Sequence, residues 1–433
     1  MNRFNFFKKS FVVMSAVLLC IITIMPTIIS TPSTTNSLPA PMYIDMIVEE
    51  TIFRRMSVRE FTDEPVTDEE LSTILWAAYG YTENGNRTVH GINGIHAGQI
   101  YVLMEDAVYK YDALNHSLVF HKDGDYRYIG QYEAPIQLGL IWDKDKSNDE
   151  NLSCAELGEI GQNIQFAANA IDMGTVVTAE IPSPLSVIGL PSNEEGKIVM
   201  PLGHPEFPYE FVYRPLWLSL LPRIKVSSVS LTNALQNRSE STSWDEDLTR
   251  QEETQAIWAS YGYSYLLDEG IATTNPVDRH RTVPSAHGYY PLRMYAVTES
   301  GISMYVPCIY DPIYGIMHGK WRFPIITFLL KVVSEDKRDE IAQASQPYVA
   351  SAPLSIISVI DIRKTNRWDD LSDERFHWLW YYEAGASAHN VLLEATAWNL
   401  SANIATITDA SAIRSTLRLN NNFVPLFIVT VGK

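Results

Sequence analysis

The residues best suited to bind an anion lie near the start of the chain, in the segment Arg54-Arg55-Met56-Ser57-Val58-Arg59, called here the cationic segment. Guanidinium groups and a hydroxyl suit a phosphate, because arginine donates paired hydrogen bonds to its oxygens. From Val58 to Phe61 the chain is predicted to be extended, so the side chains of Ser57 and Arg59 can face one ligand. Taken alone, the two adjacent arginines fit a solvated helix end better.

A second stretch lies more than 200 residues later, at Pro284-Ser285-Ala286-His287-Gly288, called here the Pro284 loop. Its small residues, Ser285, Ala286 and Gly288, let the backbone come close to a ligand. We expect the cationic segment and the Pro284 loop to meet and to hold one ligand between them.

The elements that must position these stretches follow from the apolar pattern. A helix is predicted to end at Arg54 and Arg55. A second helix begins at a capping box formed by Thr67 and Glu70 and ends at Gly80. A long helix ends near Gly174 and precedes a strand at Thr175–Ile181.

Length and charge limit the classes of protein that need consideration. A chain of 433 residues suits two domains, and 46% apolar residues can fill a large core. The formal net charge of −18 argues against a nucleic-acid partner, because phosphate binding requires a basic face. No cysteine or histidine spacing matches a metal motif, so no metal is predicted. Cys154 and Cys308 either form a disulfide or remain unpaired buried thiols.

The N-terminus has the pattern of a targeting segment. Basic residues precede an apolar run from Phe11 to Ile29, as in a signal peptide or an uncleaved membrane anchor. We assign residues 1–30 to this hydrophobic helix and 31–44, rich in Ser, Thr and Pro, to a linker. The body is therefore expected outside the cytoplasmic membrane, either membrane-anchored or secreted.

The two halves of the chain repeat one pattern, which indicates a tandem duplication. The copies are assigned to residues 45–225 and 226–433. The separation of matching residues rises from 182 to 194 and 227 along the chain, as insertions in the second copy would produce. The matching stretches are Ile74–Tyr81 with Ala256–Tyr263, Arg87–Val89 with Arg281–Val283, and Gln162-Asn163 with His389-Asn390.

The ordered set of motifs resembles the nitroreductase family of FMN-dependent oxidoreductases. The resemblance covers roughly residues 45–215 and 230–433, and each motif alone is weak. The first motifs are Arg55-x-Ser-Val-Arg-x-Phe61, Pro65-Val-Thr-x-Glu-Glu-Leu71 and Leu75-Trp-Ala-Ala78. Other motifs resemble the SagB-type branch, which contains the azoline dehydrogenases. They are the hairpin residues Tyr109, Tyr111, Asp112, Asp125 and Arg127, and the stretches Arg281–Pro291 and Gln346–Pro353. The hairpin residues suit substrate binding and a purely structural role equally.

The resemblance implies an α+β fold, a mixed sheet wrapped by helices in each copy, with FMN at a dimer interface. Here both subunits belong to one chain. We therefore expect the two copies to form an intrachain pseudo-dimer and the protein to be a monomer. The implied FMN-binding residues are Arg54, Arg55, Ser57 and Arg59, then Thr178, Ala179 and Glu180 after the long helix, Arg214, and finally Pro284, Ser285, Ala286 and Gly288. No catalytic acid or base is identified.

The two copies differ at these positions in opposite ways. In place of Arg55, Ser57 and Arg59, the second copy is aligned with Asn237, Ser239 and Ser241. In place of Pro284, Ser285 and Ala286, the first copy has His90-Gly91-Ile92. The two retained elements meet across the pseudo-dimer, so we expect one intact FMN site and one vestigial site.

The function implied is that of an FMN-dependent oxidoreductase that moves hydride or electrons to or from a small-molecule or peptide substrate. The sequence does not identify the electron donor. An alternative is a non-catalytic flavin-binding or ligand-sensing protein derived from the enzyme fold. Azoline dehydrogenation of a peptide would require a cyclodehydratase partner.

Overall fold

The computed structural model describes residues 35–207, 211–212, 218–263, 266–267, 281–310, 324–365 and 373–433. The hydrophobic helix predicted at 1–30 lies outside these residues, and so does Arg214. Among the helices of the described ranges, none is both long and apolar enough to span a membrane.

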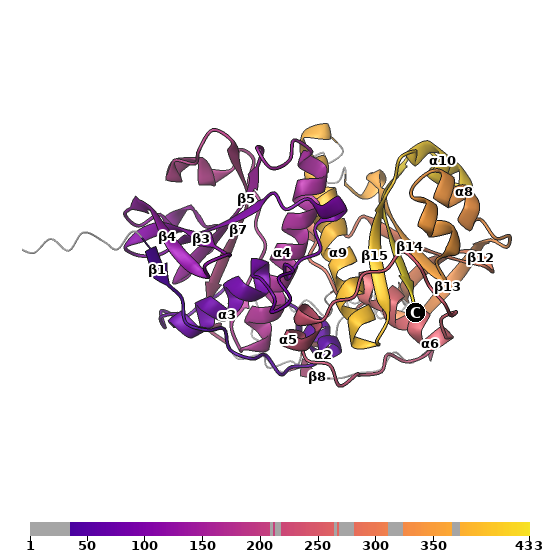
Figure 1. Cartoon of the computed structure of the whole chain (residues 1–433), viewed down its shortest axis with the longest axis horizontal. Coiled ribbons are helices and arrows are strands. Elements are labelled where there is room, and N and C mark those ends of the chain that lie inside the picture. Colours follow the sequence, from indigo (N-terminus) through magenta and orange to yellow (C-terminus); the bar gives the residue numbers. More distant parts are fainter. Residues whose placement is uncertain are drawn as a thin grey trace, which may run out of the picture. The chain divides into compact units, whose positions relative to one another are not determined.

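The first half of the chain forms a seven-stranded sheet with the order β1-β4-β3-β2-β5-β7-β6, and its strand pairs are antiparallel (Figure 1). Its strands are β1 (Thr35–Ser37), β2 (Gly98–Leu103), β3 (Ala107–Asp112), β4 (Ser117–Asp123), β5 (Ile136–Asp143), β6 (Gly174–Thr175) and β7 (Glu194–Gly203). Its helices are α2 (Val48–Arg54), α3 (Asp68–Tyr79) and α4 (Glu150–Ala170), with short 3-10 turns at Ile92–Gly94, Arg127–Ile129 and Pro184–Ile188.

The second half forms another seven-stranded sheet, with the order β15-β16-β14-β11-β12-β13-β9. Strand β9 joins β13 in parallel, which makes this sheet mixed. Its strands are β9 (Leu218–Ser219), β11 (Leu292–Thr298), β12 (Gly301–Tyr310), β13 (Pro324–Val333), β14 (Leu354–Asp361), β15 (Ser401–Thr406) and β16 (Phe423–Gly432). Its helices are α5 (Leu231–Gln236), α6 (Arg250–Tyr261), α8 (Arg338–Gln343), α9 (His377–Ala397) and α10 (Ala410–Thr416). Short 3-10 turns lie at Ala286–Gly288, Pro347–Ser351, Ile362–Lys364 and Glu374–Phe376, and β8 (Phe211–Val212) pairs with β10 (Leu266–Leu267).

The two sheets repeat one topology, which confirms the predicted duplication. The order β4-β3-β2-β5-β7-β6 of the first sheet returns as β13-β12-β11-β14-β16-β15 in the second. The predicted capping box is present in α3, where Thr67 and Glu70 exchange hydrogen bonds, and Thr249 and Glu252 form the same box in α6. The fold is the α+β architecture expected from the sequence.

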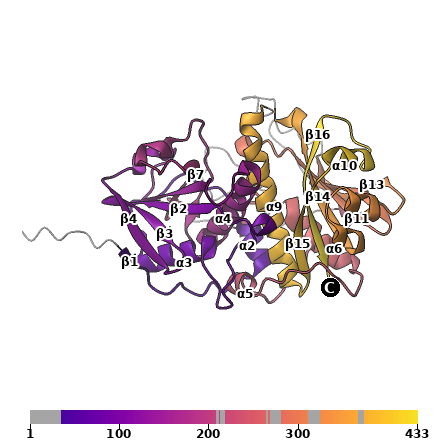
Figure 2. The ribbon, with the colours of Figure 1, turned by 45° about the horizontal axis from the view of Figure 1, so that its top comes forward.

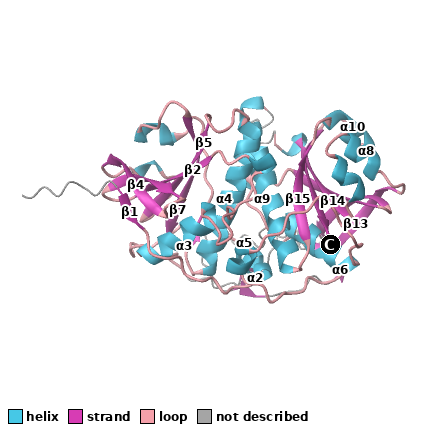
Figure 3. Cartoon of the chain, viewed as in Figure 1, coloured by secondary structure: helices cyan, strands magenta, loops and turns pink. Residues whose placement is uncertain are grey.

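The helices α4 and α9 lie side by side between the two sheets (Figures 2 and 3). Glycines at equivalent places allow this approach. A Cβ added at Gly158 would lie 2.0 Å from the carbonyl oxygen of Tyr382, and one at Gly385 would lie 2.0 Å from that of Ala155. The two copies are therefore joined by backbone contact along their central helices, as an intrachain pseudo-dimer requires.

Some predicted boundaries differ from the structure. Within the predicted linker, Thr35–Ser37 is a strand that pairs with β4, and β9 joins the second sheet although it precedes the predicted boundary at 225. The strand predicted at Thr175–Ile181 stops at Thr175, and beyond it Thr178 forms an isolated bridge with Val199. Cys154 is a free, buried thiol.

We expect Gly158→Ala to lower the free energy of unfolding by about 3 kcal/mol, because its methyl group would collide with backbone that cannot rotate away. Denaturant unfolding followed by circular dichroism measures this loss. Asn151→Ala, near the start of the same helix, is the control and should stay within about 0.5 kcal/mol of the wild type. Equal stability of the two variants would contradict this view of the helix crossing.

Candidate functional site

The cationic segment leads from the end of α2 to the second copy. The side chain of Arg55 is 1% exposed, and its Nε donates to the carbonyl oxygen of Arg281 at 3.0 Å. Its Nη1 donates to Oε1 of Gln165 in α4 at 3.3 Å. Because Arg281 lies three residues before Pro284, the structure brings the cationic segment to the base of the Pro284 loop.

The rest of the segment is extended and is held by the first copy. The N–H of Met56 donates to Oδ1 of Asn169, and that of Val58 donates to the carbonyl oxygen of Thr175, both at 2.9 Å. Ser57 is half-buried and Arg59 is exposed, with Nη1 of Arg59 donating to the carbonyl oxygen of Ser57 at 3.1 Å.

The charge of Arg55 has an unusual environment. Burial lowers the pKa of its guanidinium to about 10, Tyr290 opposes this effect, and the nearby Arg59 lowers the pKa further. Within the described part of the chain, both hydrogen-bond acceptors of Arg55 are neutral. Buried charges are normally paired with an opposite charge. A buried guanidinium beside a second cation therefore fits a site that receives an anion.

Reciprocal backbone contacts identify the residue of the second copy that is equivalent to Arg55. The N–H of Val48 donates to the carbonyl oxygen of Val229, and that of Leu231 donates to the carbonyl oxygen of Met46. The two bonds are equivalent when Met46 is matched with Val229 and Val48 with Leu231, each 183 positions later. The predicted alignment of Arg55 with Asn237 was therefore wrong by one residue, because the second copy is one residue shorter before its capping box.

The corrected register matches Arg55 with Arg238, Ser57 with Glu240 and Arg59 with Thr242. The second copy has thus lost one of the two aligned cations, not both. Like Arg55, Arg238 donates to backbone carbonyls of the opposite copy. The acceptors are the oxygens of Arg87 at 3.1 Å, Thr88 at 2.8 Å and Val89 at 3.0 Å.

In this counterpart site the chain itself supplies the anion. Oε1 of Glu240 lies 3.5 Å from Nε of Arg238 and 2.7 Å from Nδ1 of His90. Burial would raise the pKa of the Glu240 carboxyl, but His90 and Arg238 hold it below its usual range. His90 stands where the second copy has Pro284. Ser57 and Pro284 hold these two positions in the other site, where neither side chain can form an ion pair.

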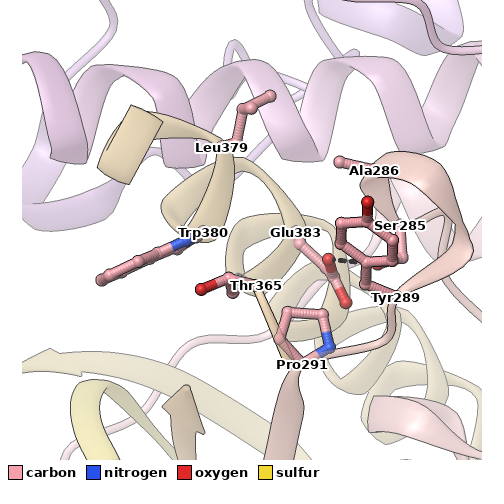
Figure 4. Close-up of a pocket in the computed structure, with 8 residues that line it drawn as sticks. All are labelled: Ser285, Ala286, Tyr289, Pro291, Thr365, Leu379, Trp380 and Glu383. Carbon is pink, nitrogen blue, oxygen red and sulfur yellow. Dashed lines mark hydrogen bonds between the residues drawn. The ribbon is translucent and has the colours of Figure 1, made fainter. Parts of the chain in front are cut away.

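A pocket lies beside the Pro284 loop, and its described lining comes from the second copy (Figure 4). Figure 4 shows Glu383 of α9 between Trp380 and Thr365 on one side and Ser285 and Tyr289 on the other. The lining residues are Ser285, Ala286, Tyr289, Pro291, Thr365, Leu379, Trp380 and Glu383.

The carboxyl of Glu383 is held by two hydroxyls. Tyr261 donates to its Oε1, and Ser285 Oγ donates to its Oε2 at 2.7 Å. The N–H of Tyr290 in turn donates to Ser285 Oγ at 2.9 Å. Burial raises the pKa of Glu383 to about 7, although both hydrogen bonds and the cations Lys364 and Arg281 oppose the increase.

The other residues singled out from the sequence are placed as follows. Arg54 pairs with Glu50 at 2.9 Å, and Pro284 is buried, whereas Gly288 is exposed with a φ of 67° that suits glycine. Thr178 is buried and its hydroxyl donates to the carbonyl oxygen of Val199, and Ala179 and Glu180 are exposed. The strand after α4 contacts the cationic segment at Thr175. Arg214 lies outside the described residues.

Glu383 and Tyr261 were missed from the sequence. A signal was present, because Glu383 repeats Glu156 at the same point of the long helices, 227 residues apart, and Tyr261 repeats Tyr79. A carboxylate at the same place in two predominantly apolar helices indicates a buried role.

Comparison with known proteins agrees with this architecture. The pattern of the nitroreductase family matches residues 52–204 and 245–433. A protein assigned to the nitroreductases in Methanocaldococcus jannaschii is 30% identical over 192 residues, which cover 39% of this chain and 96% of that protein.

One solved structure shows the same fold over most of the chain. A structure from Anabaena variabilis, also assigned to the nitroreductases, covers 93% of this chain and 94% of its own at 14% identity, with a TM-score of 0.60. Another, from Desulfovibrio desulfuricans in complex with FMN, covers 39% of this chain and 92% of its own at 21% identity, with a TM-score of 0.28. Because the family pattern matches most of both halves, the chain belongs to the nitroreductase family.

Proposed function

We propose that this protein is an FMN-dependent oxidoreductase with one flavin site per chain. The site is formed by the cationic segment of the first copy and the Pro284 loop of the second. The observation that carries the proposal is the buried guanidinium of Arg55, which lies beside Arg59 and bonds neutral acceptors within the described residues. The dianionic phosphate of FMN supplies the missing negative charge.

The residues present fit this cofactor. The guanidinium of Arg59 is exposed and donates one hydrogen bond to the described chain, which leaves further donors for phosphate oxygens. The half-buried hydroxyl of Ser57 lies between the two arginines in sequence. Ala286 and Gly288 add little bulk beside the pocket, so a flat ring can approach the loop backbone. When bound, FMN supplies the redox chemistry, and the protein holds it and shields it.

The counterpart site supports a stoichiometry of one flavin. Glu240 already neutralises Arg238 there, and a phosphate would meet its negative charge at close range. Thr242 replaces Arg59, so the second cation is missing as well. A flavin phosphate would have to displace an ion pair that the fold already holds.

The substrate of this proposal is a small organic molecule or a peptide side chain that binds at the mouth of the pocket beside Ser285 and Trp380, a cavity of about 10 Å³ that itself has room for about one water molecule. The motifs shared with the azoline-dehydrogenase branch favour oxidation of a ring within a peptide. The apolar run at Phe11–Ile29 favours a body that works outside the cytoplasmic membrane.

Flavin stoichiometry tests the single site. The full chain, reconstituted with FMN and passed through a desalting column, should retain one FMN per chain by absorbance. Two flavins would show that the counterpart site is functional, and none would overturn the proposal. A bound flavin that neither reductants nor organic acceptors can turn over would favour a non-catalytic flavin-binding protein.

Arg59→Gln should weaken FMN binding roughly 10- to 100-fold, because one charge-assisted hydrogen bond contributes about 1.5–3 kcal/mol. Titration of the chain with FMN, followed by quenching of flavin fluorescence, gives the dissociation constant. Thr242→Gln makes the same side chain at the matching position of the second copy and should leave the constant unchanged. Equal effects of the two substitutions would contradict the assignment.

Ser57→Glu copies the internal anion of the counterpart site into the proposed flavin site. We expect it to abolish FMN binding and to leave the fold intact, since Glu240 is tolerated at the matching position. Glu240→Ser is the reciprocal change and should leave one FMN bound per chain. Retention of FMN by Ser57→Glu with wild-type affinity would overturn this assignment of the site.

A further inference from the structure

The pocket beside the Pro284 loop contains one carboxyl group among its lining residues, that of Glu383. Its side chain is 3% exposed, and its two oxygens accept from the hydroxyls of Tyr261 and Ser285. Figure 4 shows the hydrogen bond from Ser285 on the loop side of the pocket. A proton on this carboxyl can therefore reach the pocket directly or through one hydroxyl.

The matching carboxylate of the first copy has a different environment. Oε2 of Glu156 accepts from the backbone N–H groups of Ala97 and Gly98 at 2.7 and 2.8 Å. Its Oε1 accepts from the hydroxyl of Tyr79 at 2.9 Å and lies 2.9 Å from Nδ1 of His96. Glu156 thus has a partner on every side and ties a strand to a helix. A structural role explains it fully.

The second copy cannot repeat that arrangement. Pro291 stands where the first copy has Ala97, and proline has no N–H to donate. Ser285, which stands where the first copy has Gly91, instead donates its hydroxyl to Oε2 of Glu383. Two fixed backbone donors have been exchanged for one rotatable hydroxyl at the edge of a pocket. A carboxylate needed only to hold the fold would not require this exchange.

The groups that face Glu383 set its charge. Tyr261 faces it from α6, Ser285 from the loop, and the cations Arg281 and Lys364 act on it from neighbouring segments. Burial outweighs them and raises the pKa of Glu383 to about 7, while burial lowers the pKa of Lys364 to about 8. A carboxyl in this range gives and takes a proton at neutral pH.

We infer that Glu383 is the proton-exchanging residue of this pocket, acting on the substrate directly or through the hydroxyl of Ser285. The inference rests on the proposed function, in which the pocket holds the substrate. Glu383 is then the acid and base that was not identified from the sequence. Ser285 would relay the proton in addition to its proposed contact with the flavin.

FMN, when bound, would supply a hydride, that is two electrons with one proton, and a substrate double bond reduced in this way would need one further proton at its neighbouring heteroatom. The carboxylic acid of Glu383 transfers its proton to that atom, and the O–H bond of the carboxyl breaks while an O–H or N–H bond of the product forms. The carboxylate then recovers a proton from water. In the reverse direction, oxidation of the substrate, the carboxylate takes the proton.

Infrared spectroscopy of the flavin-free full chain tests the group itself. The wild type should show a protonated carboxyl band that disappears with a midpoint near pH 7, and Glu383→Gln should lack it. Tyr261→Phe and Ser285→Ala should move the midpoint upward, because each removes a hydrogen bond that stabilises the charged form. A wild type without a carboxyl band that titrates near pH 7, or a Glu383→Gln chain that keeps the band with this midpoint, would overturn the inference.

Single-turnover kinetics tests the role. The FMN-loaded chain is reduced with dithionite without oxygen and mixed with 1,4-benzoquinone at pH 5.5 to 8.5. We expect Glu383→Gln to slow flavin reoxidation roughly 100-fold at pH 6 and to remove the fall in rate above pH 7 that the wild type shows. The variant must retain one FMN with an unchanged absorption spectrum.

Glu394→Gln is the matched control. Glu394 is also a fully buried carboxyl of α9, and burial raises its pKa, but it bonds Gln255 and lies outside the pocket lining. It should retain the rate and the pH profile of the wild type. If the wild type binds no FMN, the proposed function fails and this inference fails with it. If Glu383→Gln binds FMN and keeps the wild-type profile, this inference alone fails.

Discussion

A buried positive charge requires an opposite charge close by, and this requirement organises both sites of the pseudo-dimer. Arg55 and Arg238 occupy matching places, and each donates to backbone carbonyls of the opposite copy. Moving a cation out of water costs several kcal/mol unless a partner compensates. Glu240 is that partner for Arg238. Arg55 has neutral acceptors and a neighbouring cation in the described chain, which is why we propose an anionic ligand for the first site.

Gly158 and Gly385 let α4 and α9 meet at backbone distance, and this crossing joins the two copies. In a dimer of identical subunits, any substitution appears in both sites at once. Fusion of the copies in one chain removes this constraint. Glu240 could therefore arise in one site while Ser57 remained in the other.

Much of this arrangement could be predicted from the sequence, because it depends on local patterns. The capping box at Thr67 needs only residues three positions apart, and the duplication was visible in repeated octamers. The match of Arg55 with Arg238 could not be predicted from the sequence, because no local motif marks where a loop is one residue shorter. The reciprocal backbone hydrogen bonds of the two copies reveal it. Glu383 was missed for a related reason. Its burial depends on a loop almost 100 residues away, and helix periodicity does not report such contacts.

The differences between Arg55 and Arg238 and between Glu383 and Glu156 concern residues that are linked in the structure. Nε of Arg55 bonds the carbonyl oxygen of Arg281, and Nη1 of Arg281 bonds the carbonyl oxygen of Tyr261, whose hydroxyl reaches Glu383. In the counterpart, the cation is neutralised by Glu240 and the carboxylate Glu156 is held by backbone N–H groups. On the proposed function, this contrast is that of one site kept for its ligand and one in which Glu240 and Glu156 take internal partners.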